Sequence, residues 1–141
     1  MPVILDVSLS ISLPSPALAT VRVNYTIKSD PVYNDAGVWG ESVELYGASA
    51  AGQYVLIPGS QIHGPQQVFN GRFQFARSLE KTFPLTLFLQ NTSPIPQGFR
   101  PLYYATVMAR AKATPFAIQS ISQPSNAVPF VAPKPMATLK L

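Results

Sequence analysis

Fifteen prolines divide this 141-residue chain into short windows, and this division is the strongest constraint on its fold. Proline lacks the backbone N–H that a sheet ladder needs, and it also breaks the interior of a helix. Regular structure must therefore lie between the prolines. Because these windows hold strand-like patterns and no convincing helix, we expect many short β-strands.

Two windows near the N-terminus alternate between apolar and polar residues, which is the pattern of a half-buried strand. Residues 3–13 have one such face, and residues 19–28 have another. The first predicted apolar face comprises Val3, Leu5, Val7, Leu9, Ile11 and Leu13. The second comprises Ala19, Val21, Val23, Tyr25 and Ile27.

Further strands are predicted in the segments 38–47, 53–59, 66–75, 83–93, 102–113 and 116–122. Asn70-Gly71 predicts a type I′ hairpin, because both central residues of that turn need a positive φ. The segment 102–113 alternates like a strand, although its Ala, Met, Arg and Lys content also suits a helix. We favour the strand. The whole pattern predicts an all-β chain of seven to nine strands in two packed antiparallel sheets.

Two short patterns lie in the C-terminal third. One has Tyr, Ala, Val and Ala at alternate positions, namely Tyr103, Ala105, Val107 and Ala109. The other comprises Ser122, Pro124, Ser125, Asn126 and Val128. They resemble the last two strands of fibronectin type III and related immunoglobulin-like modules. The resemblance implies an immunoglobulin-like sandwich, a fold that mostly serves as a spacer, an adhesion unit or a binding scaffold. The chain departs from that family in its greater length and in its additional strand at 3–13.

The chain is unusually poor in charge. Asp, Glu, Lys and Arg make up 11% of its residues, whereas about 25% is usual in globular domains. Hydrophobic residues make up 47%, so the composition is not that of a disordered chain. A folded domain with so few charges leaves uncharged and apolar groups on its surface. We expect neighbouring proteins to cover much of it, either copies of this chain or other structural proteins.

Residues 128–141 contain three prolines, several apolar side chains and no acidic residue. The prolines favour an extended segment, so we predict a β-sandwich domain at 1–127 and an extended arm at 128–141. Three fates remain open for the arm: it is disordered, it packs on its own sandwich, or it contacts another subunit. The candidate inter-subunit residues are Val128, Phe130, Val131, Met136 and Leu139.

Groups that could perform catalysis are scarce. There is one histidine, His63, no cysteine, and no Gly-x-Ser-x-Gly motif. Glu41 and Glu44 are three apart on a predicted strand, so their side chains face opposite ways and do not form an acid–base pair. Four oxygen ligands lie close in sequence: Asp30, Asn34, Asp35 and Glu41. They lack the EF-hand spacing and occur among turn-forming residues. We predict no enzyme activity, no cofactor and no metal site.

A ligand loop is the alternative functional hypothesis. Tyr33, Asn34, Asp35 and Trp39 combine aromatic rings with polar groups, which is a combination that can stack on and hydrogen-bond a sugar. The competing interpretation places Trp39 in the core. Nucleic acid binding is not expected, because no lysine- or arginine-rich cluster occurs. A membrane span is not expected either, because no apolar run approaches 20 residues.

These observations predict a non-catalytic structural or assembly subunit of a larger particle, such as a virion decoration protein, a tail component or a surface filament. The alternative is a carbohydrate- or ligand-binding sandwich that uses the loop from Tyr33 to Trp39. The start of the sequence lacks the features of a signal peptide. We therefore expect synthesis in the cytoplasm and incorporation into a virion or another extracellular assembly.

Overall fold

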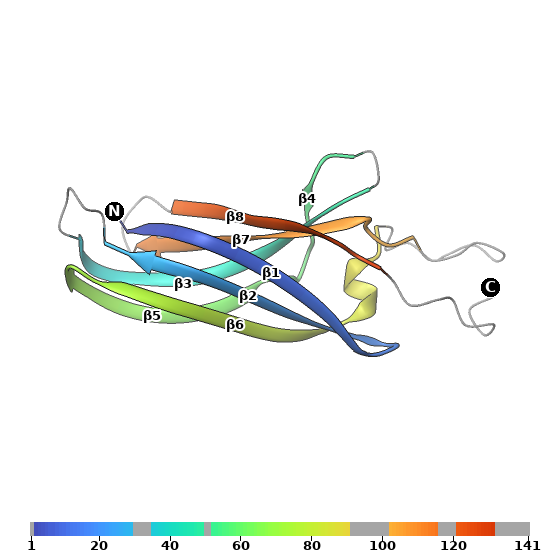
Figure 1. Ribbon diagram of the computed structural model, residues 1–141, viewed down its shortest axis with the longest axis horizontal. Coiled ribbons are helices and arrows are strands. Elements are labelled where there is room, and N and C mark those ends of the chain that lie inside the picture. Colours follow the sequence, from blue (N-terminus) through green and yellow to red (C-terminus); the bar gives the residue numbers. More distant parts are fainter. Residues whose placement is uncertain (1, 30–34, 50–51, 91–101, 116–120, 132–141) are drawn as a thin grey trace.

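The computed structural model describes residues 2–29, 35–49, 52–90, 102–115 and 121–131. Within these ranges the chain forms eight β-strands and one short 3-10 helix. The strands form two antiparallel sheets that lie against each other in an elongated sandwich (Figure 1). The predicted all-β sandwich of seven to nine strands is therefore confirmed.

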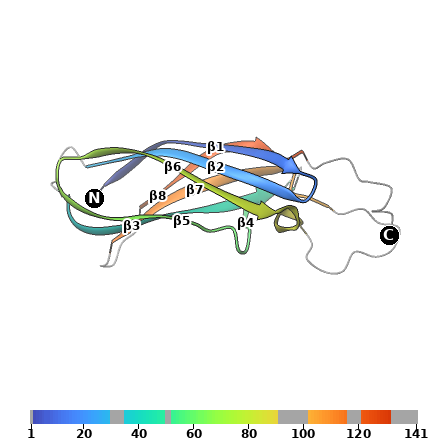
Figure 2. The ribbon, with the colours of Figure 1, turned by 90° about the horizontal axis from the view of Figure 1, so that it is seen from below.

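The smaller sheet has the strand order β1-β2-β6, with β1 at Val3–Ser15, β2 at Leu18–Lys28 and β6 at Gln74–Pro84. The larger sheet has the order β4-β3-β7-β8, and β5 also pairs with β3. Its strands are β3 at Asp35–Ala48, β4 at Val55–Leu56, β5 at Ile62–Gly71, β7 at Thr106–Pro115 and β8 at Ile121–Pro129. The 3-10 helix η1 spans Leu85–Phe88 at the end of the sandwich where β8 also ends (Figures 1 and 2).

Strands β4 and β5 behave as one interrupted strand along β3. β4 pairs with Tyr46 and Gly47, and β5 pairs with the stretch from Asp35 to Val43. Between them, the backbone of Leu45 is satisfied differently: its carbonyl accepts from the N–H of Ile57 at 2.9 Å, and its N–H donates to the Ser60 hydroxyl at 3.0 Å. One margin of β3 is therefore covered along nearly its whole length.

The prolines occupy the positions that a ladder tolerates. Pro14 lies in β1, Pro65 in β5, and both Pro124 and Pro129 in β8. Each of these strands is at the margin of its sheet, where a missing N–H leaves no neighbouring carbonyl without a partner. The central strands β2 and β3 contain no proline, and β7 contains only Pro115 at its last position.

The core lies between the sheets and comes mainly from these central strands. The predicted apolar face of β2 is confirmed, since Ala19, Val21, Val23, Tyr25 and Ile27 are all buried. The facing residues of β3 and β7 are Val43, Leu45, Val107, Ala109, Ala111 and Ala113, each with no exposed surface. The alanines of β7 allow the two sheets to approach, while the larger residues of β2 and β3 fill the space. Burial of each Val, Ile or Leu contributes about 1.5–3 kcal/mol.

The predicted apolar face of the first strand is partly wrong, because a β-bulge interrupts β1. Leu5 pairs with Thr26 and Ser8 with Asn24, so two residues of β1 stand opposite one residue of β2. Asp6 adopts a φ of 54°, in the left-handed region. The extra residue shifts the inward face by one position, and Ile4 is buried before the bulge while Leu9 is buried after it.

Two other local predictions are corrected. Asn70 and Gly71 do not form a hairpin between paired strands, because they pair with Ala36 and Asp35 of β3 while the following strand pairs with β2. The chain thus crosses from one sheet to the other at this point. The segment 83–93 does not form a central strand, because η1 begins directly after β6. The preference for strand over helix in 102–113 is confirmed by β7.

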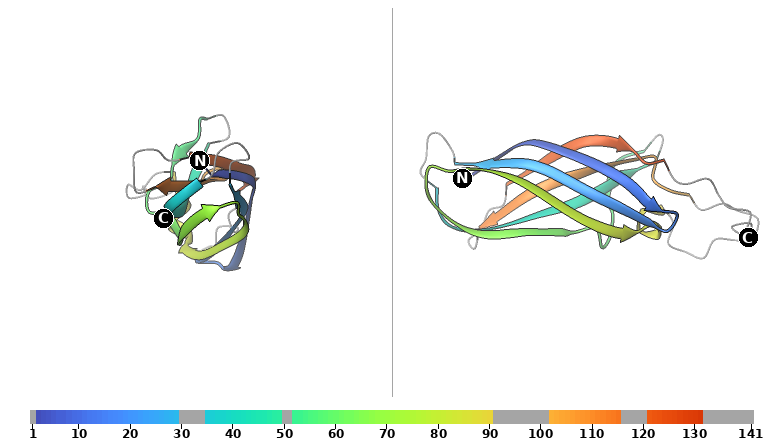
Figure 3. Two further views of the ribbon diagram at one scale, coloured as in Figure 1. Left: turned by 90° about the vertical axis from the view of Figure 1, so that its left-hand side faces the viewer. Right: turned by 60° about the horizontal axis from the view of Figure 1, so that its bottom comes forward.

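The facing margins of the two sheets are joined by a side chain. Strands β1 and β8 lie side by side (Figure 3). The N–H of Leu9 donates to Oδ1 of Asn126 at 2.8 Å, and Nδ2 of Asn126 donates to the Leu9 carbonyl at 3.4 Å. Asn126 therefore replaces a strand partner and closes this side of the sandwich.

The bulge provides a test of the fold. We predict that Asp6→Val lowers the free energy of unfolding by about 1–2 kcal/mol, because a β-branched residue is strained at a positive φ. We expect Asp6→Gly to leave it unchanged within about 0.5 kcal/mol, because glycine adopts this conformation freely. Urea unfolding followed by circular dichroism measures both changes. Equal effects of the two substitutions would contradict the left-handed conformation.

Candidate functional site

The structure places the candidate arm residues in two groups. Val128 lies in β8 opposite Val107 and is half-buried. Phe130 is buried: its ring stacks on Phe88 with centroids 4.6 Å apart, and its N–H donates to the Ala105 carbonyl at 2.9 Å. The first residues of the predicted arm are thus part of the sandwich.

The remaining arm residues differ from these. Val131 directly follows Phe130, and its side chain is 76% exposed. Met136 and Leu139 lie outside the described residues. Contact of the arm with another subunit therefore remains a prediction. Among the candidate contact residues that the structure describes, Val131 is the one that is largely exposed to solvent.

Only part of the candidate ligand loop lies within the described residues. Tyr33 and Asn34 lie outside the described residues, and Asp35 begins β3, where its backbone pairs with Gly71. Trp39 is buried, with 6% of its surface exposed, and it belongs to the hydrophobic core. A ring that stacks on a sugar must offer a face to solvent, so Trp39 is not available for this role in the structure.

His63 lies in β5 opposite Ser42, and its side chain is exposed. Among the described residues, no group of three or more His, Asp or Glu side chains is close enough to hold a metal ion. The residues that the structure describes also contain no helix that is long and apolar enough to cross a bilayer.

A charged cluster is buried between the two sheets. Glu41 of β3 projects inward, and its side chain has no exposed surface. Nε of Arg77 donates to Oε1 of Glu41 at 3.0 Å, and Nη2 of Arg77 donates to Oε2 at 3.0 Å. The hydroxyl of Tyr25 donates to Oε1 at 2.6 Å. Arg77 and Tyr25 are register partners on β6 and β2, so the cluster links the smaller sheet to the larger one.

The local backbone makes room for this cluster. A register shift in the β3–β5 ladder lies between Gly40 and Ser42, and Glu41 occupies it. Gly64 of β5 passes so close that a Cβ at this position would lie 3.1 Å from both Cβ and the carbonyl oxygen of Glu41. A larger residue at 64 would therefore press against the backbone of β3 at Glu41.

The cluster is suited to structure rather than catalysis. The bidentate pairing with Arg77 and the hydrogen bond from Tyr25 occupy both oxygens of the carboxylate. Burial raises the pKa of the Tyr25 phenol well above its ordinary value, and the hydrogen bond to Glu41 and the charge of Glu41 raise it further, while Arg77 lowers it. Tyr25 is thus held in its neutral, hydrogen-bond-donating form.

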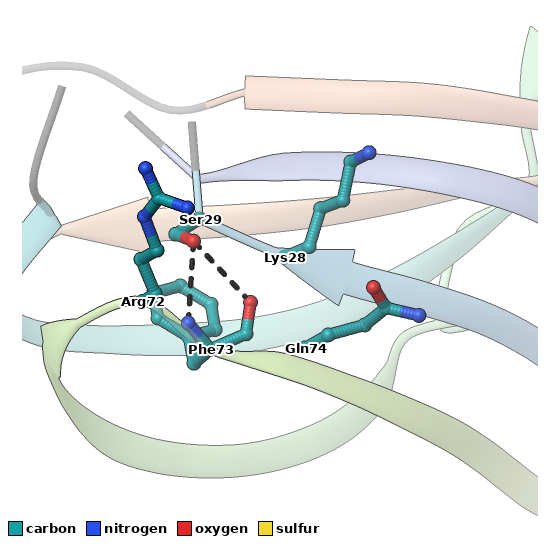
Figure 4. Close-up of a pocket in the computed structure, with 5 residues that line it drawn as sticks. All are labelled: Lys28, Ser29, Arg72, Phe73 and Gln74. Atoms are coloured by element: carbon teal, nitrogen blue, oxygen red, sulfur yellow. Dashed lines mark hydrogen bonds between the residues drawn. The ribbon is translucent and has the colours of Figure 1, made fainter. Parts of the chain in front are cut away.

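An open pocket of about 410 Å³ lies where β2 ends and β6 begins (Figure 4). Its lining residues are Lys28, Ser29, Arg72, Phe73 and Gln74. The hydroxyl of Ser29 accepts from the N–H of Phe73 at 3.2 Å, and this bond ties the end of β2 to the start of β6. Lys28 and Arg72 give the pocket a positive lining, but both extend from its rim and neither is buried.

The exposed large apolar residues lie in two regions of the described structure. The turn between β1 and β2, the residues beside η1 and the end of β8 all lie at one end of the sandwich (Figures 1 and 3), which we call the arm end. The arm end carries Leu13, Leu18, Leu102 and Val131, which are 38%, 41%, 63% and 76% exposed. The second place is β4 and the residue before it, namely Tyr54, Val55 and Leu56.

Sequence reasoning missed the pairing of Glu41 with Arg77, although a signal was present. Glu41 has the same strand parity as the buried Trp39 and Val43. Arg77 likewise has the parity of Phe75 and Leu79, which pack against the core. Two opposite charges on inward-facing positions indicate a buried pair, because an unpaired charge in a core is too costly.

No protein-family model and no curated protein matches this sequence.

The buried pair can be tested by a double-mutant cycle. We predict that Glu41→Leu or Arg77→Met alone lowers the free energy of unfolding by about 3–5 kcal/mol. Arg77→Met leaves the buried Glu41 carboxylate without its cation, and Glu41→Leu takes the bidentate acceptor from the largely buried Arg77. The double variant should lose much less unfolding free energy than the sum of the two single losses. Urea unfolding measures all three changes. The exposed pair of Arg22 and Glu80, whose atoms are also 3.0 Å apart, is the matched control and should show a coupling below about 1 kcal/mol. Additive effects at Glu41 and Arg77 would contradict the pairing.

The protonation of Tyr25 gives a pH-dependent prediction. Since folding holds Tyr25 neutral, its contribution to stability is complete below about pH 10 and decreases as the pH rises above that value. In a spectrophotometric titration of the six tyrosines, we expect Tyr25 to ionise only as the protein unfolds. Tyr25→Phe should remove one late-ionising group and lower stability at neutral pH by about 2 kcal/mol. Burial also raises the pKa of Tyr103, so the comparison of variant with wild type isolates Tyr25.

Proposed function

We propose that this chain is a non-catalytic structural subunit of a larger assembly, and that it binds its neighbours through the arm end of the sandwich and the arm that follows. The single observation that supports this most is the exposure of four large apolar residues, Leu13, Leu18, Leu102 and Val131. Leu13 and Leu18 lie beside the turn between β1 and β2, Leu102 bonds to Gln90 after η1, and Val131 follows Phe130. Exposed apolar groups that cluster, rather than occur singly, mark contact surfaces.

The low charge of the chain supports the same proposal. With 11% charged residues, the surface has few groups to oppose association. Phe130 adds a mechanical argument: it is fixed in the core while the next residue is exposed, so a contact made by the arm would be transmitted to the domain.

We further infer that the domain is an immunoglobulin-like sandwich related in architecture to fibronectin type III modules. In such folds the first, second and fifth strands share one sheet, and the third lies beside the sixth, which lies beside the seventh. If β4 and β5 count as one interrupted strand, β1, β2 and β6 correspond to the first group and β3, β7 and β8 to the second. Modules of this type often act as spacers or adhesion units, which agrees with a structural role but does not establish it.

The assemblies that fit this proposal are a virion, as a decoration or tail component, and a surface filament. The partners would be copies of this chain or other structural proteins of the particle. The chain would then be made in the cytoplasm and carried in the extracellular particle. The alternative of a sugar-binding loop receives no support from Trp39, because its ring is enclosed by the core.

Multi-angle light scattering after size exclusion tests the proposal over a wide range of concentration. We expect the wild-type chain to exceed the mass of one subunit as the concentration rises. A chain that stops after Val131, and the variant Leu102→Asp, should both shift toward the monomer. Ending the chain after Val131 rather than before Val128 keeps Phe130 in the core, so a change in mass would not reflect unfolding.

The matched control is Gln74→Asp, which adds the same charge to an exposed residue at the opposite end. It should associate like the wild type. Circular dichroism confirms that each variant is folded. A wild-type chain that remains monomeric at all concentrations, both alone and with candidate particle proteins, would refute the proposal.

A further inference from the structure

The margin of the larger sheet that is formed by β4 is unusually accessible. β4 pairs with β3 on one side, and no strand among the described residues pairs with its other side. Its two residues, Val55 and Leu56, are 51% and 48% exposed, and the preceding Tyr54 is 38% exposed. Three consecutive large apolar residues therefore lie beside backbone groups that can accept another strand.

This margin also lacks the usual protection by charge. Natural edge strands commonly carry Lys or other charged side chains that prevent pairing with another chain. Residues 45–71, which include β4 and β5, contain no Asp, Glu, Lys or Arg. Lys81 of β6 reaches the start of β5, where Nζ is 3.4 Å from the Gln61 carbonyl, but this contact does not extend to β4.

The other margins are protected. β1 and β8 face each other and are joined through Asn126. β6 carries Arg77, Glu80 and Lys81 along its length. β5 is also uncharged, but it contains Pro65, which cannot donate to a further strand. Both residues of β4, by contrast, are apolar and about half exposed.

The edge is held in place before any partner arrives. The hydroxyl of Thr106 donates to the Tyr54 hydroxyl at 3.1 Å, and this bond holds the residue before β4 against the start of β7. After β4, Ile57 and Ser60 bond to the backbone of Leu45 and fix its other end. A surface that is ordered in advance loses less entropy when it binds.

We propose that the edge of β4, residues Tyr54–Leu56, docks against the same edge of a second copy of this chain, so that the two larger sheets join in antiparallel fashion around a twofold axis. The inference rests on the proposed function and assigns one of its interfaces. In a twofold contact the residues near the axis meet their own counterparts, so a charge there would meet a like charge. An edge without charge over residues 45–71 avoids this repulsion, whereas a partner selected by charge would require complementary groups here.

The test introduces charge at Val55, whose exposed side chain can be replaced without disturbing the core. Val55→Lys and Val55→Glu should each raise the dissociation constant of the self-associated species by about tenfold or more, because like charges meet across the axis. An equimolar mixture of the two variants should associate again, because opposite charges then meet. Sedimentation velocity measures all three, and Ser10→Lys on the exposed face of β1 controls for added charge alone.

The outcomes separate this inference from the proposed function. One outcome would refute the inference alone: the wild type associates, and the arm-end variants weaken this association, but Val55→Lys, Val55→Glu and their mixture all associate like the wild type. The β4 edge would then not be an interface. If the mixture associates and the separate Val55 variants do not, the inference holds even when the arm-end variants have no effect. Dissociation of both variants without recovery in the mixture would also overturn the twofold contact.

Discussion

The pairing of backbone N–H groups governs the arrangement of this sandwich. A strand at the centre of a sheet must donate on both sides, so a residue without an N–H cannot lie there. In a chain with fifteen prolines this leaves few candidates for the centre, and β2, β3 and β7 are those that qualify. The strands that contain internal prolines, β1, β5 and β8, are placed at the margins. Because the central strands also carry the inward apolar residues, the same constraint determines where the core lies and which edges remain available to other molecules.

Much of the fold follows from sequence, and the failures have identifiable physical causes. Alternation located β1, β2 and β7, and it gave the correct inward face of β2 because nothing interrupts its ladder with β6. In β1 the same reasoning failed at Asp6, since alternation assumes an unbroken register and one bulged residue reverses it. Asn70-Gly71 suggested a hairpin from local turn chemistry, yet the chain changes sheets there because pairing with β3 and β2 outweighs pairing between the two adjacent segments. Such long-range competition is not encoded in a dipeptide.

The candidate site was less accessible to sequence reasoning than the fold. Trp39 was open to two interpretations, and its burial depends on how closely the sheets approach, which no local pattern expresses. The role of Glu41 depends on residues distant in sequence, because Arg77 and Tyr25 come from two strands of the other sheet. The apolar arm end is likewise assembled from a turn, the surroundings of a 3-10 helix and the end of the last strand. Sequence indicated that the surface was poor in charge, whereas only the structure locates the apolar residues on it.

The aromatic stack beneath the arm has a mechanical consequence. The two termini of the sandwich lie at opposite ends of its long axis, so tension applied through the residues after Val131 would run along the strands (Figure 1). Phe130 and its stack with Phe88 and Tyr103 would receive the load first and pass it to β8. β8 is bonded to β7 at successive positions, so sliding the two strands past each other would require several bonds to break together rather than one after another. The ladder between β7 and β8 therefore opposes extension of the domain along its strands.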